Sequence, residues 1–488
     1  MSLLSEAQGQ PVKFGTDGWR GVIAADYTVA NVRRCAQATA RLVKEAGGQR
    51  QGVVVGYDTR FGSEHFAAAV AEVLAGNDIK VFLCEGAVPT PVVSFGILEK
   101  GAQNGVIITA SHNPAIWNGY KLRSDYGGAA GPEVVERLEG YIGEASQPGE
   151  KQASLISSTP LEEAVEKGLV EYYDPAPGYR RKVAQLVDLQ RIRDSGLRVI
   201  FDPMYGAGIG WLPQLIGGGD TEVIEINGER NPFFGGVNPE PIARNLQKLQ
   251  REVTQRSANI GIATDGDADR LGVCDENGEF VDQLRVYSLL MLYMLEAREQ
   301  RGPIVKTLST SSMLDRLGAL YDVPVYETGV GFKYVAPKML ETDAMIGGEE
   351  SGGYAFRGHL PERDGILAGL FIIDLCVRME LRPSELIEYL FSKVGPHYYD
   401  RIDSHFDAGR RQEIISKLED EPAEVVSGRR VVRFQTDDGF KFHLEDGSWL
   451  LIRFSGTEPI IRIYSESSSS EQVREILEAG RQLVEAGI

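Results

Sequence analysis

The sequence predicts an α/β fold in which three similar mixed α/β domains and a C-terminal α+β domain surround a central cleft. A rhythm of short apolar runs and helical patterns begins three times, which is typical of mostly parallel sheets covered by helices. Roughly the last hundred residues carry closely spaced strands instead, as in a small antiparallel sheet. The 488-residue length is enough for several domains. The expected domains are residues 1–168, 169–258, 259–375 and 376–488.

The first block begins with a helix and continues with alternating strands and helices. The helix is indicated by apolar residues at helical spacing, namely Val29, Val32, Ala36, Ala40 and Val43. Strands are predicted at 52–58, 79–86 and 105–111, and further helices at 63–76 and 91–100. The stretch 144–160 is rich in Ser, Gln, Gly and Pro, so it is expected to be a loop or an interdomain connection.

The second and third blocks repeat this rhythm, although no residue-level repeat is evident. In the second, helices are expected near 175–190 and 240–256, and strands at 197–203 and 221–227. In the third, strands are expected at 259–265, 303–308, 323–328 and 344–348, and helices at 284–300 and 311–321. The last block has strands at 429–436, 439–446, 448–456 and 460–466, followed by a helix at 470–486.

The charge balance limits the classes of partner. Acidic residues outnumber basic ones by 70 to 51, which gives a net charge of -19. A nucleic-acid-binding protein needs a basic surface, so no nucleic-acid partner is expected. An anionic substrate would have to be bound by a local cluster of Arg and Lys, because the overall field repels it.

Cysteine usage and the N-terminus indicate a cytoplasmic location. The four cysteines, Cys35, Cys84, Cys274 and Cys376, are far apart and form no CxxC pair, so buried thiols in a reducing compartment are expected. The first residues lack the charged and apolar regions of a signal peptide. No run approaches the roughly 18 apolar residues of a membrane span, so no membrane partner is expected.

The clearest chemical motif is TDGDADR, in which Asp265, Asp267 and Asp269 follow a predicted strand. Three carboxylates this close repel one another, and a hard divalent cation relieves the repulsion. An EF-hand is a rival, with Glu276 at its twelfth position, but Arg270 occupies the sixth position, where the turn needs Gly. A solvated acidic turn is the other alternative. A Mg²⁺ site is favoured, because magnesium takes few protein ligands together with a phosphate oxygen.

The segment TASHNP places Ser111 and His112 at the end of a predicted strand, before the Asn113-Pro114 turn. The carboxyl ends of strands are where α/β sheets bind ligands. The flanking residues do not form the GxSxG pattern of a serine hydrolase, and a plain turn remains an alternative. Lys121, ten residues further on, is expected to reach the same site as a proton carrier or a phosphate clamp.

Two other loops have the composition of ligand sites. RFSGTEP offers a guanidinium, hydroxyls and loop N–H groups from Arg453, Ser455, Gly456 and Thr457, which suits a phosphate, although a hairpin end with an exposed arginine is an alternative. GGEESGGYAF carries Glu349 and Ser351 among glycines, as a sugar-binding loop would, but such acidic loops are common. The sequence contains no GxxxxGK[ST] loop, which disfavours ATP-driven transfer.

Taken in order, TASHNP with Lys121, DGDADR, GEES and RFSGTEP resemble the motifs of the α-D-phosphohexomutase family. FGTDGWRG at 14–21 is similar to the N-terminal phosphate-contacting segment of that family, with Arg20 in the matching place. The resemblance extends from residue 14 to about residue 465.

This resemblance implies a phosphorylated Ser111 that exchanges its phosphoryl group with a hexose phosphate through a bisphosphate. One Mg²⁺ ion would be bound by the Ser111 phosphate and by Asp265, Asp267 and Asp269. Lys121 would transfer a proton or stabilise charge, with His112 and Arg270 as neighbours. The remaining substrate-binding residues implied are Arg20, Lys333, Glu349, Ser351, Arg453, Ser455, Gly456 and Thr457.

The loop patterns favour glucose phosphates. GEES, with Glu350, and TGVGFK at 328–333, with Lys333, resemble the phosphoglucomutase pattern, whereas Val330 replaces the histidine of the phosphomannomutases. We therefore expect interconversion of glucose 1-phosphate and glucose 6-phosphate, with glucose 1,6-bisphosphate as intermediate or activator. Phosphomannomutase, dual-specificity and bisphosphate-synthase activities stay open, as does a non-catalytic sugar-phosphate-binding role. The expected partners are small hexose phosphates, and the protein is expected to be a monomer or a homodimer.

Overall fold

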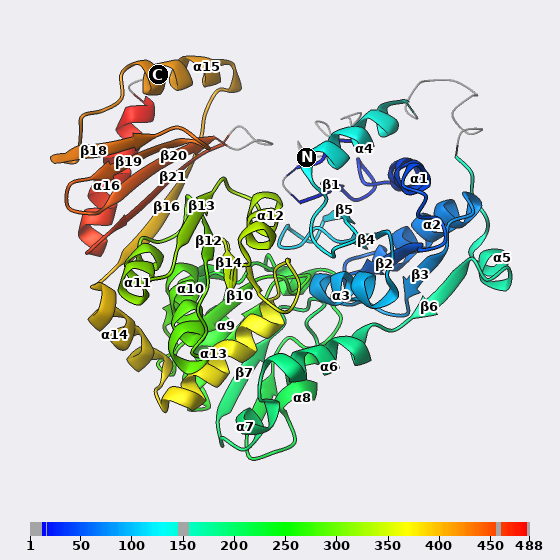
Figure 1. Cartoon of the computed structure of the whole chain (residues 1–488), viewed down its shortest axis with the longest axis horizontal. Coiled ribbons are helices and arrows are strands. Elements are labelled where there is room, and N and C mark those ends of the chain that lie inside the picture. The colour runs from blue at the N-terminus through cyan, green and yellow to red at the C-terminus, as the bar shows by residue number, and fades with distance from the viewer. Residues whose placement is uncertain (1–11, 16, 145–155, 455–459, 486–488) are drawn as a thin grey trace.

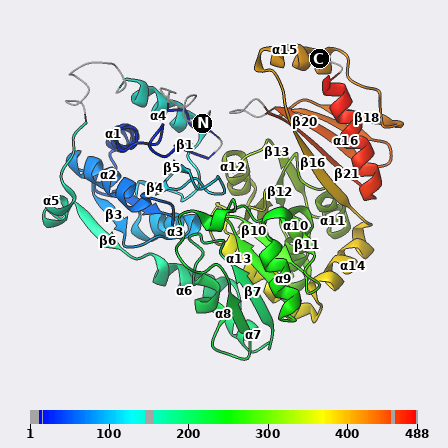
Figure 2. The same cartoon turned by 180° about the vertical axis from the view of Figure 1, so that it is seen from behind.

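A computed structural model of the chain describes residues 12–15, 17–144, 156–454 and 460–485. The predicted fold class is confirmed, because the described part contains four sheets with helices packed around them. In Figure 1 the first sheet lies on the right and the fourth at the upper left, with the second and third sheets between and below them. Figure 2 shows the same arrangement from behind.

The first sheet has six strands in the order β1-β5-β4-β2-β3-β6. Its strands are β1 (Trp19–Val22), β2 (Val53–Tyr57), β3 (Val81–Cys84), β4 (Asn104–Ile108), β5 (Trp117–Arg123) and β6 (Val170–Tyr173). Its helices are α1 (Val29–Glu45), α2 (Ser63–Gly76), α3 (Thr90–Lys100), α4 (Pro132–Glu144) and α5 (Leu161–Glu166). Strands β4, β2, β3 and β6 are parallel, while β5 runs antiparallel between β1 and β4. Because side chains alternate along β5, Lys121 and Arg123 share one face of the sheet.

The second sheet has the order β11-β10-β9-β7-β8. Its strands are β7 (Arg198–Asp202), β8 (Glu222–Glu225), β9 (Ile260–Thr264), β10 (Leu271–Cys274) and β11 (Phe280–Val281). The accompanying helices are α6 (Ala176–Leu186), α7 (Leu189–Arg193), α8 (Trp211–Ile216) and α9 (Gln247–Gln255). Strand β9 pairs in parallel with β7 and antiparallel with β10, so the loop that carries the three aspartates belongs to this sheet.

The third sheet has the order β13-β12-β14-β15. Its strands are β12 (Ile304–Thr307), β13 (Val325–Thr328), β14 (Ile346–Gly348) and β15 (Tyr354–Phe356). The surrounding helices are α10 (Gln283–Leu292), α11 (Met313–Tyr321), α12 (Phe332–Thr342), α13 (Gly365–Met379) and α14 (Pro383–Val394). The Asp364 carboxylate accepts a hydrogen bond from the Leu367 N–H and so caps the N-terminus of α13.

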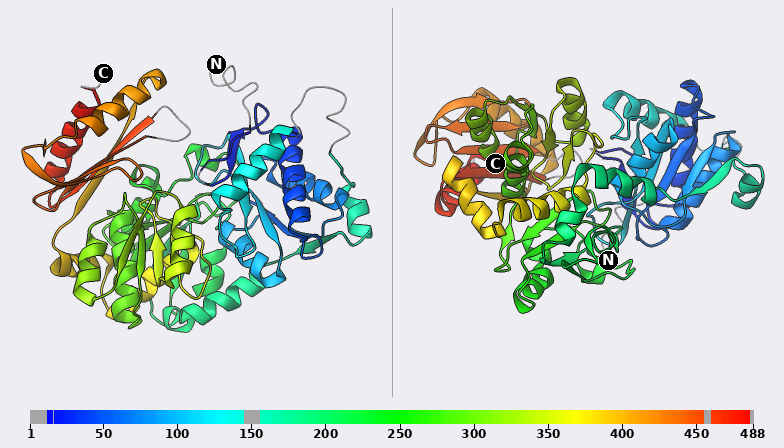
Figure 3. Two further views of the ribbon diagram at one scale, coloured as in Figure 1. Left: turned by 45° about the horizontal axis from the view of Figure 1, so that its top comes forward. Right: turned by 60° about the horizontal axis from the view of Figure 1, so that its bottom comes forward.

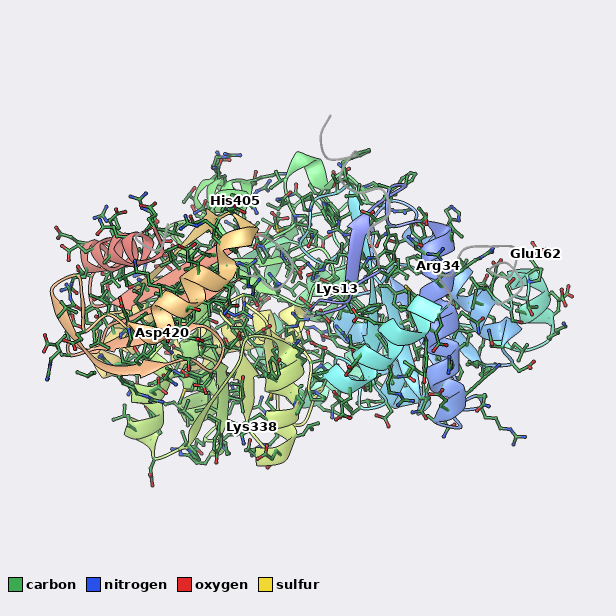
Figure 4. The ribbon with its side chains drawn as sticks, turned by 90° about the horizontal axis from the view of Figure 1, so that it is seen from above. Lys13, Arg34, Glu162, Lys338, His405 and Asp420 are labelled. Atoms are coloured by element: carbon green, nitrogen blue, oxygen red, sulfur yellow. The ribbon has the colours of Figure 1, made fainter. Side chains whose placement is uncertain are left out.

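The fourth sheet is antiparallel, in the order β16-β21-β20-β19-β18-β17. Its strands are β16 (Tyr398–His405), β17 (Val425–Val426), β18 (Arg429–Gln435), β19 (Phe440–Leu444), β20 (Trp449–Phe454) and β21 (Ile460–Ser467). Helices α15 (Arg411–Asp420) and α16 (Ser470–Glu485) accompany it. Figures 3 and 4 show this sheet standing apart from the first one, and in Figure 4 His405 and Asp420 lie on its side of the molecule and Arg34 on the other.

The apolar cores explain this arrangement. One buried cluster contains Val54 and Ile107 of the first sheet, Phe201 of the second, Ile346 of the third and Ile366 of α13. The fourth sheet has a separate core, in which residues such as Phe442 and Ile463 pack against α15 and α16. A small cluster containing Leu308 and Trp449 joins the fourth sheet to the third.

Some expected boundaries fall inside these units. The proposed divisions after residues 168 and 258 each precede a strand that joins the preceding sheet, β6 and β9 respectively, and the division after residue 375 falls within α13.

Two expected helices are shorter than predicted. The helix expected near 240–256 consists only of α9 and is preceded by a 3₁₀ turn at Ala243–Asn245. The helix expected at 284–300 begins as α10, which gives way to a π-helical turn at Tyr293–Ala297. No helix in the described residues is both long and apolar enough to cross a membrane.

Candidate active site

Ser111 lies just beyond β4 in a left-handed backbone conformation, with φ of 51°. Few residues other than glycine adopt this conformation, so the surrounding structure must hold it. The side chain is buried, and its Oγ donates a hydrogen bond of 2.8 Å to Oδ2 of Asp265. The Ser111 N–H donates to Oγ1 of Thr109 at 2.9 Å. Thus the serine from the first sheet directly contacts the acidic loop of the second.

The acidic loop joins β9 to β10, and carboxylate oxygens of Asp265, Asp267 and Asp269 lie within 4.8 Å of one another. The flanking elements are strands, which supports the exclusion of an EF-hand. Main-chain N–H groups of Asp269 and Arg270 donate to Oδ1 of Asp265 and shape the turn. All three aspartates are buried, and burial together with the charges of Asp267 and Asp269 raises the pKa of Asp265 well above its usual value.

This loop fits a divalent cation. The Oδ1 atoms of Asp267 and Asp269 are buried and accept no hydrogen bond from any described residue. Buried carboxylate oxygens left without partners are costly, and a hard cation satisfies them. Asp265, Asp267 and Asp269 therefore form a cluster that can hold a divalent metal ion.

Lys121 lies beside the same loop, fully within the protein. Its Nζ is 2.8 Å from Oδ2 of Asp267, 3.2 Å from Oδ2 of Asp269 and 2.8 Å from Oδ2 of Asp17. Burial alone would lower the pKa of Lys121, but Asp17 and the two loop aspartates raise it above the usual value. Lys121 is therefore an ammonium at neutral pH, positioned within reach of the serine loop.

Asp17 is the centre of a network of buried ions. Its Oδ1 is 2.7 Å from Nη1 of Arg123, and its Oδ2 is 2.6 Å from Nη2 of Arg363. Burial would raise the pKa of Asp17, but Arg123, Lys121 and Arg363 hold it well below its usual value. The contact with Arg363 connects the first sheet to the segment that precedes α13.

Arg363 also connects the acidic loop with the expected sugar-binding loop. Its Nη2 is 3.0 Å from Oδ2 of Asp269, and its Nη1 is 3.6 Å from Oε2 of Glu349. Burial raises the pKa of Glu349 to about 7, although Arg363 opposes the shift. The Oγ of Ser351 is buried and makes no hydrogen bond with any described residue. Glu350 accepts a hydrogen bond of 2.6 Å from Oγ of Ser309.

His112 and the predicted arginines surround the serine. The Nδ1 of His112 is 3.4 Å from Oγ of Ser111. Burial and the positive charges of Arg270 and Arg20 hold the pKa of His112 well below its usual value, so its ring is neutral at pH 7. Arg20 donates a hydrogen bond to the side chain of Asn113. Nε of Arg270 lies 4.0 Å from Oδ1 of Asp269.

The predicted residues of the fourth domain are separate from this cluster. Nε of Arg453 is 3.2 Å from Oδ1 of Asp438, and Oδ2 of the same carboxylate accepts the Val330 N–H at 2.7 Å. Asp438 therefore connects Arg453 to the loop after β13. Ser455, Gly456 and Thr457 lie outside the described residues.

Two cavities border these elements. One, of about 160 Å³, is lined by Asp17, Glu136, Glu139 and Lys333, so it places the predicted Lys333 opposite the first domain. The other, of about 650 Å³, lies between the third and fourth sheets and is lined by residues including Lys306, Glu327, Gly329, Arg433, Lys441 and His443. Glu327 pairs with Lys441 there at 3.0 Å.

Several residues of the cluster were not identified from the sequence. Asp17 lies in the FGTDGWRG segment together with the predicted Arg20, and the polar run PERDG before α13 holds Arg363. Thr90 donates a hydrogen bond of 2.6 Å to Oδ2 of Asp267. Arg60 contacts the backbone around Ser111. No local spacing marks Thr90 or Arg60 as part of the site.

The chain is similar to known proteins along nearly its whole length. Models of the phosphoglucomutase/phosphomannomutase family match at residues 11–148 (alpha/beta/alpha domain I), 177–278 (domain II), 283–394 (domain III) and 413–482 (C-terminal domain). A phosphoglucomutase/phosphomannomutase of Thermococcus kodakarensis is 33% identical, with 97% of this chain and 99% of the relative covered.

A probable phosphoglucosamine mutase of Methanothermobacter thermautotrophicus is 34% identical, with 98% of each chain covered. A crystal structure from Thermus thermophilus, provisionally named a phosphomannomutase, superposes with a TM-score of 0.84 at 35% identity, with 98% of this chain and 99% of that one covered.

Proposed function

Because the chain belongs to the α-D-phosphohexomutase family, we propose that it interconverts glucose 1-phosphate and glucose 6-phosphate through a phosphorylated Ser111 and a glucose 1,6-bisphosphate intermediate. The observation that carries this proposal is the 2.8 Å contact between Oγ of Ser111 and the buried cluster of aspartates. A hydroxyl beside a cation site is arranged for phosphoryl transfer, in which positioning and charge stabilisation supply most of the catalysis.

The exchange balances as two transfers. In the first, the bond between phosphorus and Oγ of Ser111 breaks and Oγ takes up a proton, while a sugar hydroxyl oxygen bonds to the phosphorus and gives its proton to a base. In the second, the bisphosphate has turned over: Oγ of Ser111 gives up its proton and bonds to the phosphorus at the other end, the bond from that phosphorus to the sugar oxygen breaks, and the sugar oxygen takes up a proton. A single donor and a single clamp suffice, because the two ends of the sugar occupy the same places in turn.

The side chains around Ser111 have distinct roles in this scheme. Asp265, Asp267 and Asp269 would hold Mg²⁺, which when bound supplies charge stabilisation for the transferred phosphoryl group. Lys121 adds positive charge next to the serine, held in place by Asp17. His112 supports the loop as a neutral ring and is the proposed third member of the catalytic set.

Substrate recognition is assigned to the surrounding loops. Glu349 and Ser351 would bind sugar hydroxyls. The phosphate that does not react would be bound by Arg453, the hydroxyls of Ser455 and Thr457 and the main-chain N–H of Gly456, while Arg20, Arg270 and Lys333 would supply further positive charge to the substrate. The buried, unpaired Oγ of Ser351 supports this assignment, because a ligand hydroxyl would satisfy it.

The choice of sugar is tested by a mutase assay across phosphates of glucose, mannose, glucosamine and ribose. The GEES and TGVGFK loops favour glucose, while the relatives are named phosphoglucomutase/phosphomannomutase and probable phosphoglucosamine mutase. A larger kcat/KM for the mannose or glucosamine phosphate would reassign the substrate and leave the mechanism intact. Accumulation of bisphosphate in step with an added phosphodonor would indicate a bisphosphate synthase.

The phosphoserine itself is tested by intact-protein mass spectrometry. The active protein should carry about 80 Da on Ser111, the mass added by one phosphorylation. S111A should lose both this mass and the mutase activity. Active protein without the modification would refute the mechanism, and unchanged turnover in S111A would favour the non-catalytic alternative.

A further inference from the structure

Arg60 is enclosed by the backbone segment that carries Ser111. Its side chain is fully buried in the turn between β2 and α2. Its Nη2 donates to the carbonyl oxygens of Ser111 at 2.6 Å and Asn113 at 2.7 Å. Its Nη1 donates to the carbonyls of Pro114 at 2.9 Å and Trp117 at 3.0 Å. One guanidinium therefore binds four carbonyls of a single loop.

The remaining donor of Arg60 is also used. Its Nε donates to Oδ2 of Asp58 at 3.1 Å, so all five N–H groups of the guanidinium have partners. Asp58 is fixed in turn by the hydroxyls of Thr109 at 2.6 Å and Ser63 at 2.9 Å. The ring of Phe234 lies 4.8 Å from the guanidinium carbon and covers it from the second domain. This arrangement leaves the guanidinium a single orientation.

The carbonyl of Ser111 is confined from two sides. Nη2 of Arg60 binds it from one side, and Gly266 of the acidic loop packs against the other, where an added Cβ would stand 2.4 Å from the oxygen. Ser111 itself has the left-handed φ of 51°, which needs external support. A shift of this carbonyl would turn the Cα–Cβ bond and move Oγ away from Asp265.

We propose that Arg60, fixed by Asp58, is a positioning residue that holds the Ser111 backbone so that Oγ faces the acidic loop. The inference rests on the proposed phosphoryl transfer at Ser111. Arg60 touches no reacting atom and acts through the backbone alone. Lysine cannot replace it, because an ammonium has three donors and no planar fork to reach four carbonyls.

The test compares the parent protein with R60K and R60A. A misplacement of about 1 Å costs about 100-fold in rate, so both variants should lose about that factor in kcat. KM for the hexose phosphate should change less than kcat, because most of the proposed substrate-binding residues lie in the third and fourth domains, although Arg20 contacts Asn113 in the same segment. Millimolar guanidinium chloride should restore part of the R60A rate in a saturable way, whereas ammonium chloride should not. A parental kcat in folded R60K, or no rescue of R60A by guanidinium, would overturn the proposal.

R193K is the matched control, because Arg193 also donates to a carbonyl, that of Leu215, but within the second domain away from Ser111. It should lower thermal stability without changing kcat, and an equal loss of kcat in R193K would count against the proposal. Amide hydrogen exchange of residues 109–118 separates this inference from the proposed function. If the parent is not a mutase, faster exchange of this segment in R60K would still support the clamp, and unchanged exchange would refute it.

Discussion

Replacing Asp17 with asparagine tests whether the buried ion network stabilises the three N-terminal domains. Asp17 pairs with Lys121, Arg123 and Arg363 at distances of 2.6–2.8 Å, and its side chain is 9% exposed. Removing one partner of a buried ion pair costs about 3–5 kcal/mol. In D17N, each of the three cations would still be paired with another carboxylate, namely Asp267, Glu362 or Asp269. No buried charge is left unpaired, so the lower end of that range applies. We expect D17N to lose about 3 kcal/mol.

A protein with an ordinary stability of about 5–15 kcal/mol remains folded after this loss. The assay is urea unfolding of metal-free protein, with the exposed Asp220→Asn as control. Because the pKa of Asp17 is lowered in the folded state, its contribution is present above the unfolded pKa of about 4 and is lost as pH falls further. The difference between D17N and the parent should therefore shrink below about pH 4. Equal stability of the two proteins at pH 7, or a difference that persists unchanged in acid, would refute the electrostatic reasoning.

The other predictions concern the acidic loop, the sugar loop and the fourth domain. D269N should weaken Mg²⁺ binding, measured by titration calorimetry. Loss of an outer-shell partner already lowers metal affinity by roughly 10- to 100-fold, so loss of a direct ligand should cost at least that factor. A Mg²⁺ affinity equal to that of the parent would exclude the cation site. Because the pKa of Glu349 is raised to about 7 in the folded state, ionising this carboxyl destabilises the fold. As pH rises from about 4.5 to 7, the free energy of unfolding of the metal-free protein should therefore fall by on the order of 3 kcal/mol relative to that of E349Q. A difference in unfolding free energy that does not change with pH would contradict this. D438A frees Arg453 and the Val330 N–H, so KM for the hexose phosphate should rise more than kcat falls, and steady-state kinetics in which only kcat changes would argue against Asp438 positioning the clamp.

The metal loop was predictable from the sequence because its three aspartates alternate within five residues, so local spacing alone brings them together. The approach of Ser111 to Asp265 was not, since 154 residues separate them. That approach was expected only through the resemblance to a family. The structure brings the two together because strands β4 and β9, in different sheets, end at the same place.

The residues that support the site could not be predicted from local sequence patterns, for a different reason. Arg60, Asp17 and Arg363 are ordinary charged residues in polar turns, and a charged turn residue is usually solvated. The pairing of Asp17 with Arg363 spans 346 residues. Strand rhythm likewise predicts that β9 exists but not which sheet it joins, and it gives no strand at β6, because strand pairing is decided by tertiary packing.

The shared apolar core of the first three sheets has a consequence for how the molecule melts. Residues up to about Val394 contribute to one continuous cluster, and the first domain adds a second cluster that contains Val53 and Val55. Because the first cluster joins all three sheets, these domains should unfold as a single cooperative unit. The fourth domain has its own core and contacts the rest through a small apolar patch around Trp449 and polar contacts such as Lys441 with Glu327, so it should behave as an independent unit. Differential scanning calorimetry should therefore resolve two transitions rather than four. Removing Trp449 contacts by W449A should separate them further, whereas a single transition would show that the small patch is enough to merge the two units.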